Sequence, residues 1–242
     1  MPERADPGGP GLLVLNGGDE FHPGNEAQDR ELVTAAAGRG PAYVLPTAAA
    51  RQRPELAVAT ATRWFGALGL SLEELPVLRR QDVQSAELAG RARAAGFLYL
   101  VGGDPGFVVR ILAGSRVWES IALTWAGDAA LAGSSAGAMA LCSHSLVMAR
   151  WPRHEVRRPV PALGLVPGAV VVPHYERFGS RWTMDGDAGL VVLGIDERTA
   201  AVWDGPGWRA AGAGAVTVLR EGAAQVFPAG TACQGIPAPV VT

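Results

Sequence analysis

The sequence predicts an α/β fold built on a mainly parallel sheet with helices on both faces. Short apolar runs alternate with longer segments of helical spacing along most of the chain. The short runs are apolar throughout, which is typical of strands that are buried on both faces. Two of them end in the same glycine-rich turn, at 17–19 and at 102–104, where a strand gives way to a helix.

The expected elements follow one another in a regular order. We expect strands at 12–16, 42–45, 75–78, 97–101, 129–132, 169–172 and 190–195. We expect helices at 27–37, 54–68, 83–95, 117–125 and 135–146, and a further one that starts at Pro105. Asn25 and Asp104 are candidate N-caps, and proline suits the first helical turn. We interpret 151–168 as a long loop, and the chain after residue 200 as a strand meander at one edge of the sheet.

Length and charge limit the classes of function. The chain has 242 residues, a formal net charge of −2 and no lysine. We expect a disordered lead at 1–10 and a single domain over 11–242. The charge gives no reason to expect nucleic acid or an anionic membrane as a partner, and the lack of lysine excludes a Ser–Lys dyad. Neither a signal peptide nor an apolar run of about 20 residues is apparent, so we expect a cytoplasmic protein.

Two cysteines, Cys142 and Cys233, are present. They form no Cys-x-x-Cys motif and no cluster with histidine, so we expect no structural zinc site and no other metal. Cys142 lies in an apolar run and is interpreted as a small core residue. We do not expect a disulfide between the two in a cytosolic chain.

The strongest local indication of function is a G-x-S-x-G pattern at 133–137, with Ser135 at its centre. It lies between a predicted strand and a predicted helix, the context in which this pattern marks a nucleophile. The sharp turn lifts the serine out of the sheet, and the small flanking residues let neighbouring backbone pass close by. The N–H of Ala136 then points toward an oxyanion that forms on the substrate. The alternative is an ordinary turn in a chain rich in glycine and alanine.

A nucleophilic serine needs a base, and four histidines are candidates. His174 directly follows an apolar strand at its carboxyl end. In a parallel sheet ligands bind at that edge, where Ser135 also lies. His22 is the second choice by the same logic. We interpret His144 as a helix-packing residue and His154 as a solvated one.

Asp196 and Glu197 close the strand 190–195 and offer an acid to orient the base. Their side chains point in opposite directions if the strand continues, so one serves the site while the other caps or pairs. The alternative is a polar turn before the next strand. At another strand end, Gly103 offers its backbone N–H as a second oxyanion donor, although on its own this turn is an ordinary strand–helix connection.

Four ordered blocks resemble the serine peptidases that include dipeptidase E (aspartyl dipeptidase) and cyanophycinase. They are LYLVGGDPGFVVRIL at 98–112, AGSSAGAMAL at 132–141, LGLVPGAVVVPHY at 163–175 and GIDERTAAVW at 194–203. The resemblance covers about residues 12–220 and implies a class I glutamine amidotransferase-like fold, a flavodoxin-like three-layer sandwich. It implies Ser135 as nucleophile, His174 as base and Glu197 as acid. This order differs from the Ser…Asp/Glu…His order of α/β-hydrolases.

The resemblance is incomplete around the histidine. Family members often carry an acidic residue two positions before it, where this chain has Val172. They also tend to carry arginines after it. Arg177 and Arg181 are the nearest equivalents, and they either hold a substrate carboxylate or are solvated loop residues. Asp104 is a further candidate for substrate binding, and the segment 148–162 is interpreted as a lid or a wall of the pocket.

These residues predict a serine-type peptidase that cleaves short peptides through an acyl-enzyme and uses no cofactor. Two alternatives stay open. One is a non-peptide amidase or esterase, which shares the chemistry of the turn, and the other is a non-catalytic binding module on an amidotransferase-like fold. The sequence leaves open the preferred side chain, exo- or endo-cleavage, and the choice between a monomer and a homodimer.

Overall fold

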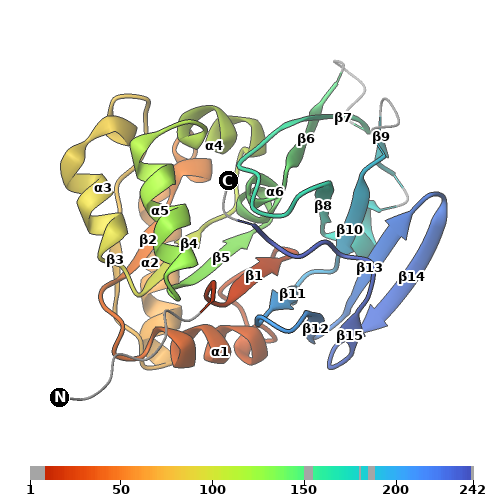
Figure 1. Cartoon of the computed structure of the whole chain (residues 1–242), viewed down its shortest axis with the longest axis horizontal. Helices are drawn as coiled ribbons and strands as arrows, with labels where there is room; N and C mark the ends of the chain where they lie inside the picture. The colour runs from red at the N-terminus through yellow and green to blue at the C-terminus, as the bar shows by residue number, and fades with distance from the viewer. Residues whose placement is uncertain (1–8, 150–154, 180, 185–188, 241–242) are drawn as a thin grey trace.

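The structure is a computed structural model that describes residues 9–149, 155–179, 181–184 and 189–240 (Figure 1). The predicted disordered lead at 1–10 lies outside the described residues, apart from its last two. The α-helices are α1 Glu26–Ala36, α2 Pro54–Ala67, α3 Ala86–Arg93, α4 Pro105–Leu112, α5 Arg116–Ala126, α6 Ala136–Leu141 and α7 Tyr175–Phe178. Two 3₁₀ turns, η1 Thr47–Ala49 and η2 Asp82–Gln84, precede α2 and α3.

The main sheet has eight strands in the order β15-β12-β11-β1-β5-β4-β2-β3. Their bounds are β1 Leu13–Asn16, β2 Ala42–Leu45, β3 Leu72–Glu74, β4 Phe97–Leu100, β5 Ala130–Ser134, β11 Thr199–Trp203, β12 Trp208–Gly212 and β15 Ala232–Cys233. All neighbours from β1 to β3 are parallel, and β11, β12 and β15 add antiparallel strands beyond β1. The predicted mainly parallel sheet with a C-terminal meander at its edge is confirmed.

Two smaller sheets stand beside the main one (Figure 1). One has the order β14-β13-β10-β8, with β8 Ala169–Pro173, β10 Val191–Ile195, β13 Ala215–Arg220 and β14 Ala223–Pro228. The other has the order β6-β7-β9, with β6 His144–Met148, β7 Val156–Pro161 and β9 Thr183–Met184. The sequence argument placed β8 and β10 in the main parallel sheet. They do pair in parallel, but with each other in a separate sheet.

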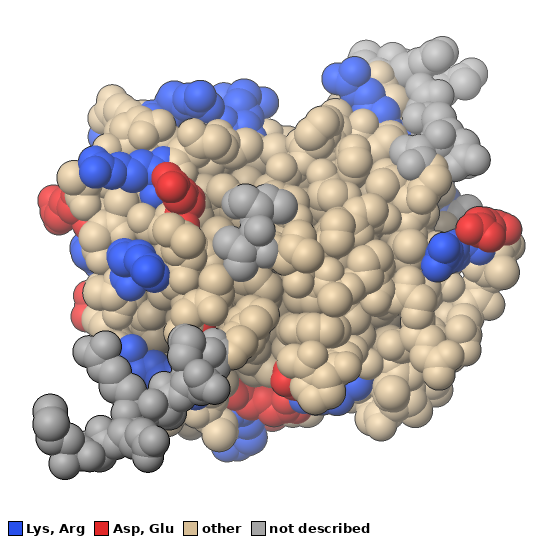
Figure 2. Space-filling view, viewed as in Figure 1, with Lys and Arg blue, Asp and Glu red and all other residues tan. Residues whose placement is uncertain are grey.

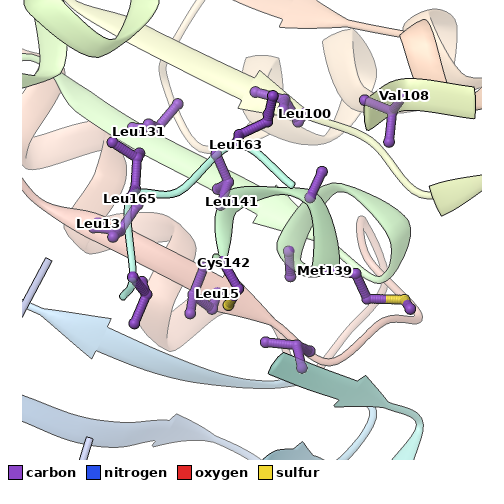
Figure 3. Close-up of a cluster of buried hydrophobic side chains, with 14 of the residues drawn as sticks. Leu13, Leu15, Leu100, Val108, Leu131, Met139, Leu141, Cys142, Leu163 and Leu165 are labelled. Carbon is purple, nitrogen blue, oxygen red and sulfur yellow. The ribbon is translucent and has the colours of Figure 1, made fainter. Parts of the chain in front are cut away.

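Alternation along the central strands divides the core between the two faces of the main sheet. Leu98 and Leu100 face one side, which holds α3, α4, α5 and α6. Phe97 and Tyr99 face the other side, which holds α1 and α2. This period-2 pattern is the one expected of strands covered on both faces. Figure 3 shows Leu141 of α6 among leucines of β1, β4 and β5, so that this short helix packs against the sheet.

Three predicted elements differ from the structure. The strand predicted at 75–78 is wrong: β3 ends at Glu74, because Pro76 has no N–H to offer a ladder. The helix predicted at 135–146 ends at Leu141, and β6 follows. The long loop predicted at 151–168 contains β7, which pairs antiparallel with β6. The apolar run of β6 is compatible with a helix and with a strand, and its antiparallel pairing with β7 makes it a strand.

The described residues show no feature of a membrane span. None of their helices combines the length and the apolar character that crossing a bilayer requires. On the face shown in Figure 2, arginines and acidic side chains lie mostly toward the edges, with the two signs close together in places. This distribution offers no continuous basic field on that face.

Candidate active site

The turn between β5 and α6 is fixed by close backbone contacts. Ser135 has φ 47° and ψ −110°, a conformation that residues with side chains rarely adopt. A Cβ on Gly133 would lie 2.6 Å from the carbonyl carbon of Gly137, and one on Gly137 would lie 2.2 Å from the carbonyl oxygen of Leu100. Only glycine fits either position. The G-x-S-x-G spacing therefore lets this strained turn pack against β4.

Ser135, His174 and Glu197 form one line of hydrogen-bonding atoms. Ser135 Oγ lies 3.2 Å from His174 Nε2, and His174 Nδ1 lies 2.8 Å from Glu197 Oε1. Ser135 follows a strand of the main sheet, whereas His174 follows β8 of the four-stranded sheet. The two residues therefore meet across two sheets and not along the edge of one. The backbone N–H of His174 donates to the carbonyl of Gly17 at 2.8 Å, and this hydrogen bond connects the end of β8 with the end of β1.

Glu197, and not Asp196, is the carboxylate that reaches the histidine. The Asp196 side chain turns the other way, and its Oδ2 accepts a hydrogen bond of 2.9 Å from the Ala215 N–H at the start of β13. The Asp196 and Glu197 side chains thus point in opposite directions, as successive side chains of an extended segment do. Asp196 fixes the connection between β10 and β13, and Glu197 meets His174 Nδ1.

Two residues of α7 hold Glu197 from the outer side. Arg177 Nη1 donates to Glu197 Oε1 at 2.8 Å, and Glu176 Oε2 accepts from the Glu197 N–H at 3.0 Å. Partial burial of the Glu197 carboxyl opposes its ionisation, but hydrogen bonds from Arg177 and His174 outweigh this effect and lower its pKa. An ionised Glu197 favours a proton on Nδ1 of the imidazole, which leaves Nε2 as the acceptor that faces Ser135.

The turn after β1 packs closely against the imidazole. Gly18 has φ 115°, and a Cβ there would lie 2.2 Å from His174 Cε1. Its N–H donates to Asn16 Oδ1 at 3.1 Å, and its carbonyl accepts from the Arg198 N–H at 2.9 Å. Sequence reasoning treats this stretch as a tight turn only. The glycine pair at a strand end, which recurs at 102–103, is the feature that could have marked it.

The candidate oxyanion donors lie at the ends of β4 and β5. Among the described residues, neither the Gly103 N–H nor the Ala136 N–H donates to another group. Gly103 has φ 145°, and a Cβ there would lie 2.3 Å from the carbonyl oxygen of Ala48. Asp104 caps α4 as predicted, since its Oδ1 accepts from the Phe107 N–H at 2.9 Å. The role of Asp104 in substrate binding stays a prediction.

None of the remaining described candidates forms a hydrogen bond with Ser135 Oγ. The His22 side chain is 58% exposed and contacts Asp19. His144 lies in β6 and not in a helix, and its Nδ1 is 3.0 Å from Ser143 Oγ. His154 lies outside the described residues. Arg181 is exposed, and among the described residues its guanidinium forms no hydrogen bond, ion pair or ring contact.

Cys142 and Cys233 are both free and buried, and burial raises the pKa of Cys142 to about 12. Within the described ranges, no three His, Cys, Asp or Glu side chains are grouped so that they could share a metal ion.

An aromatic stack connects the histidine with the three-stranded sheet. The Phe178 ring meets the His174 ring edge-on, with centroids 6.0 Å apart. Trp182 stacks on Phe178 at 6.1 Å, and the Arg157 guanidinium of β7 lies 4.0 Å from the Trp182 centroid. The small sheet therefore borders the region beyond α7. Its strand β7 falls in the segment 148–162, whose role as a lid or a wall of the pocket stays a prediction.

Comparison with known proteins defines the family. The profile of peptidase family S51 matches residues 12–209, which is most of the chain. The chain belongs to peptidase family S51. It is therefore a hydrolase, and specifically a peptidase. The resemblance to the family of dipeptidase E and cyanophycinase is confirmed.

Relatives and solved structures agree with this family. The cyanophycinases of Trichormus variabilis and of a Nostoc species are each 27% identical to this chain over 218 residues, which is 86% of this chain and 72% of theirs. A peptidase from an acI-B1 Actinobacterium superimposes with a TM-score of 0.82 at 28% identity, covering 94% of this chain and 98% of that one. A putative peptidase E of Listeria monocytogenes gives a TM-score of 0.54 at 17% identity, covering 90% and 98%, and this likeness shows the fold alone.

Proposed function

We propose that the S51 chain is a serine peptidase that cleaves short peptides through a triad of Ser135, His174 and Glu197. One observation carries the proposal: the imidazole lies between the serine hydroxyl, at 3.2 Å, and the carboxylate, at 2.8 Å. The strained strand–helix turn that presents the serine is the setting in which such a nucleophile works. Membership of a peptidase family supports a peptide bond as the substrate.

The triad supports a two-step acyl transfer. His174 Nε2 takes the hydroxyl proton while Ser135 Oγ attacks the peptide carbonyl carbon, and the Ala136 and Gly103 N–H groups stabilise the oxyanion. The imidazolium then protonates the leaving amine, and an acyl-enzyme remains. Water, deprotonated by His174, attacks the acyl carbon and releases the acid, and the proton returns to Ser135 Oγ. Glu197 stays ionised throughout and stabilises the imidazolium.

The arginines after His174 differ in how far they are free to bind substrate. Arg177 already donates to Glu197, whereas Arg181 is exposed and its guanidinium forms no hydrogen bond, ion pair or ring contact with the described residues. We therefore place Arg181 first as the contact for a substrate carboxylate, with Arg177 and Asp104 as further contacts. The scheme uses no cofactor, and the cytoplasm remains the predicted location.

A panel of di- and tripeptides with Asp, Glu, Arg or apolar residues at the cut tests the proposal. Free amine release is followed for the wild-type protein and for Ser135→Ala, together with labelling by a fluorophosphonate probe. We expect wild-type turnover, labelling of Ser135, and loss of both in Ser135→Ala, whose circular dichroism spectrum stays unchanged. Labelling without turnover of any peptide would point to a non-peptide amidase or esterase. A folded wild-type protein that shows neither would contradict catalysis by this triad.

A further inference from the structure

One carboxylate bridges the two loops that present the proposed oxyanion donors. Glu20 lies in the loop after β1, and its side chain forms hydrogen bonds at the ends of β4 and β5. Its Oε1 accepts a hydrogen bond of 2.9 Å from the Gly102 N–H, and its Oε2 accepts one of 2.8 Å from Ser134 Oγ. Those two donors immediately precede Gly103 and Ser135 in the chain.

The hydrogen bonds of Glu20 join the two loops beyond the last paired residues of β4 and β5. The pairing of β4 with β5 stops at Leu100 opposite Gly133, so the sheet ladder does not extend to the two loops beyond it. A Cβ on Gly102 would lie 2.9 Å from Glu20 Oε1 and 3.4 Å from the Ser135 Cβ. The glycine loop is thus placed between the carboxylate and the nucleophile, and its position relative to the serine depends on this contact.

Glu20 is itself anchored on both sides. Phe21, which has φ 62°, is 7% exposed and packs against Tyr99 with ring centroids 5.1 Å apart. Asp19 forms an ion pair with Arg198 Nε at 2.5 Å, and the carbonyl of Asp19 accepts from Asn25 Nδ2 at 2.8 Å. A carboxylate held between two fixed neighbours provides a rigid reference point for the loops that it joins.

We propose that Glu20 is a positioning residue that sets the distance between the Gly103 and Ala136 N–H groups. The inference rests on the proposed function, because it assigns those two groups to the oxyanion. Oxyanion donors act in the transition state and contribute little to ground-state binding, so their misplacement lowers kcat more than it changes KM. Glu20 acts through the placement of its two hydrogen bonds and not through its charge. An amide in its place keeps an acceptor for the Gly102 N–H and can donate to the Ser134 hydroxyl.

The test compares Glu20→Ala, Glu20→Gln and Ser134→Ala with a control, Glu26→Ala. Glu26 lies six residues further along the chain and accepts from the Gly24 N–H, and it forms no hydrogen bond with the described residues of either oxyanion loop. We expect Glu20→Ala to lower kcat about 10- to 100-fold with KM changed less than about threefold, and to slow fluorophosphonate labelling by a similar factor. Glu20→Gln should keep most of the wild-type kcat. The kcat of Ser134→Ala should lie between those of Glu20→Ala and Glu20→Gln, and the kcat of Glu26→Ala should equal that of the wild type.

The outcomes separate this inference from the proposed function. A wild-type protein that neither cleaves peptides nor reacts with the probe would overturn both. A reactive wild type with Glu20→Ala within twofold of it in kcat and labelling rate would overturn only the role of Glu20. A change confined to KM would also overturn it, since Glu20 would then contact substrate. If Glu20→Ala fails to fold, equal activities of Glu20→Gln, Ser134→Ala and the wild type would still contradict the proposal.

Discussion

The two halves of the site are held in different ways. On the side of the proposed nucleophile, Ser134 is fully buried, and the turn is fixed where backbone lies against backbone at Gly133 and Gly137. On the side of the proposed base and acid, the His174 and Glu197 side chains are 26% and 19% exposed, and polar side chains of α7 hold Glu197. The first half belongs to the main sheet, and the second follows strands of the four-stranded sheet.

This difference predicts how each half responds to change. Close-packed backbone leaves no room for an added atom, so a substitution there displaces the structure abruptly. Polar contacts at a partly exposed edge are screened by water and can be lost one at a time, so each costs less. The contact between the halves, where the main-sheet turn at Gly18 meets the imidazole, should behave like the rigid side.

Of the substitutions that compare the two halves, Gly18→Ala is expected to have the largest effect. The added methyl group would lie 2.2 Å from His174 Cε1, so the imidazole must leave the position in which it meets Ser135 and Glu197. We expect kcat to fall on the order of 100-fold, because a displacement of about 1 Å at a reacting group has an effect of this size. The measurement is peptide hydrolysis by wild type and variant at saturating substrate.

Gly69→Ala is the matched control for Gly18→Ala. Gly69 also has positive φ, at 94°, but no atom lies within 4 Å of its added Cβ. In both variants an alanine with positive φ lowers the free energy of unfolding by about 1–2 kcal/mol. Only Gly18→Ala also disturbs His174. If both variants lost activity equally, backbone strain and not the contact with the imidazole would be responsible.

The rigid half of the site was the easier one to predict from the sequence. Gly133, Ser135 and Gly137 are close in the chain, and the contacts that require glycine are made within the turn or with the neighbouring strand. A local pattern therefore contains most of the information. The positions of His174 and Glu197 could be predicted because apolar strands end directly before them, and the resemblance to the family supported the same choice.

The sheet that carries the second half could not be predicted in the same way. A parallel pair such as β8 and β10 has the same buried apolar pattern whether it joins the main sheet or another one, and only distant pairing decides. The partners of Glu20 and Arg177 were missed for a related reason. The hydrogen bond of Glu20 to Ser134 joins residues 114 apart in the chain, and nothing local indicates where such a side chain points.

A smaller effect is expected on the exposed side from Arg177→Met. The Arg177 side chain is 62% exposed, so its hydrogen bond to Glu197 is screened, but it lowers the pKa of that carboxyl. Without it, the pKa of Glu197 rises and the carboxylate is less firmly placed. We expect kcat to fall on the order of tenfold for every peptide, with the acid limb of the pH–rate profile moved to higher pH.

The peptide panel distinguishes this role of Arg177 from substrate binding. If Arg177 acts through Glu197, the loss in kcat is the same for acidic and apolar peptides. If it binds a substrate carboxylate instead, KM rises for acidic peptides only, and the pH profile stays in place. Arg63→Met, which removes an exposed arginine on α2 without a described partner, is the control for the loss of one positive charge.

The smallest effect on catalysis, and a clear one on stability, is expected from Asp29→Asn. Asp29 of α1 is 1% exposed, beneath the main sheet. Its burial raises its pKa to about 7, although a hydrogen bond from Trp64 Nε1 opposes the rise. The unfolded chain releases this proton near pH 4, so between about pH 4 and 7 the folded state binds more protons and stability falls as pH rises.

Asparagine removes this titration and keeps an oxygen for the Trp64 N–H. The difference in free energy of unfolding, variant minus wild type, should therefore increase from pH 5 to pH 8, by an amount on the order of 3 kcal/mol at most. Urea unfolding at several pH values measures it, and Glu55→Gln, which removes an exposed carboxylate, should show no such trend. A difference for Asp29→Asn that stays constant over this range would mean that Asp29 is ionised in the core. The nucleophile side would then tolerate a buried charge that close packing and low polarity should exclude.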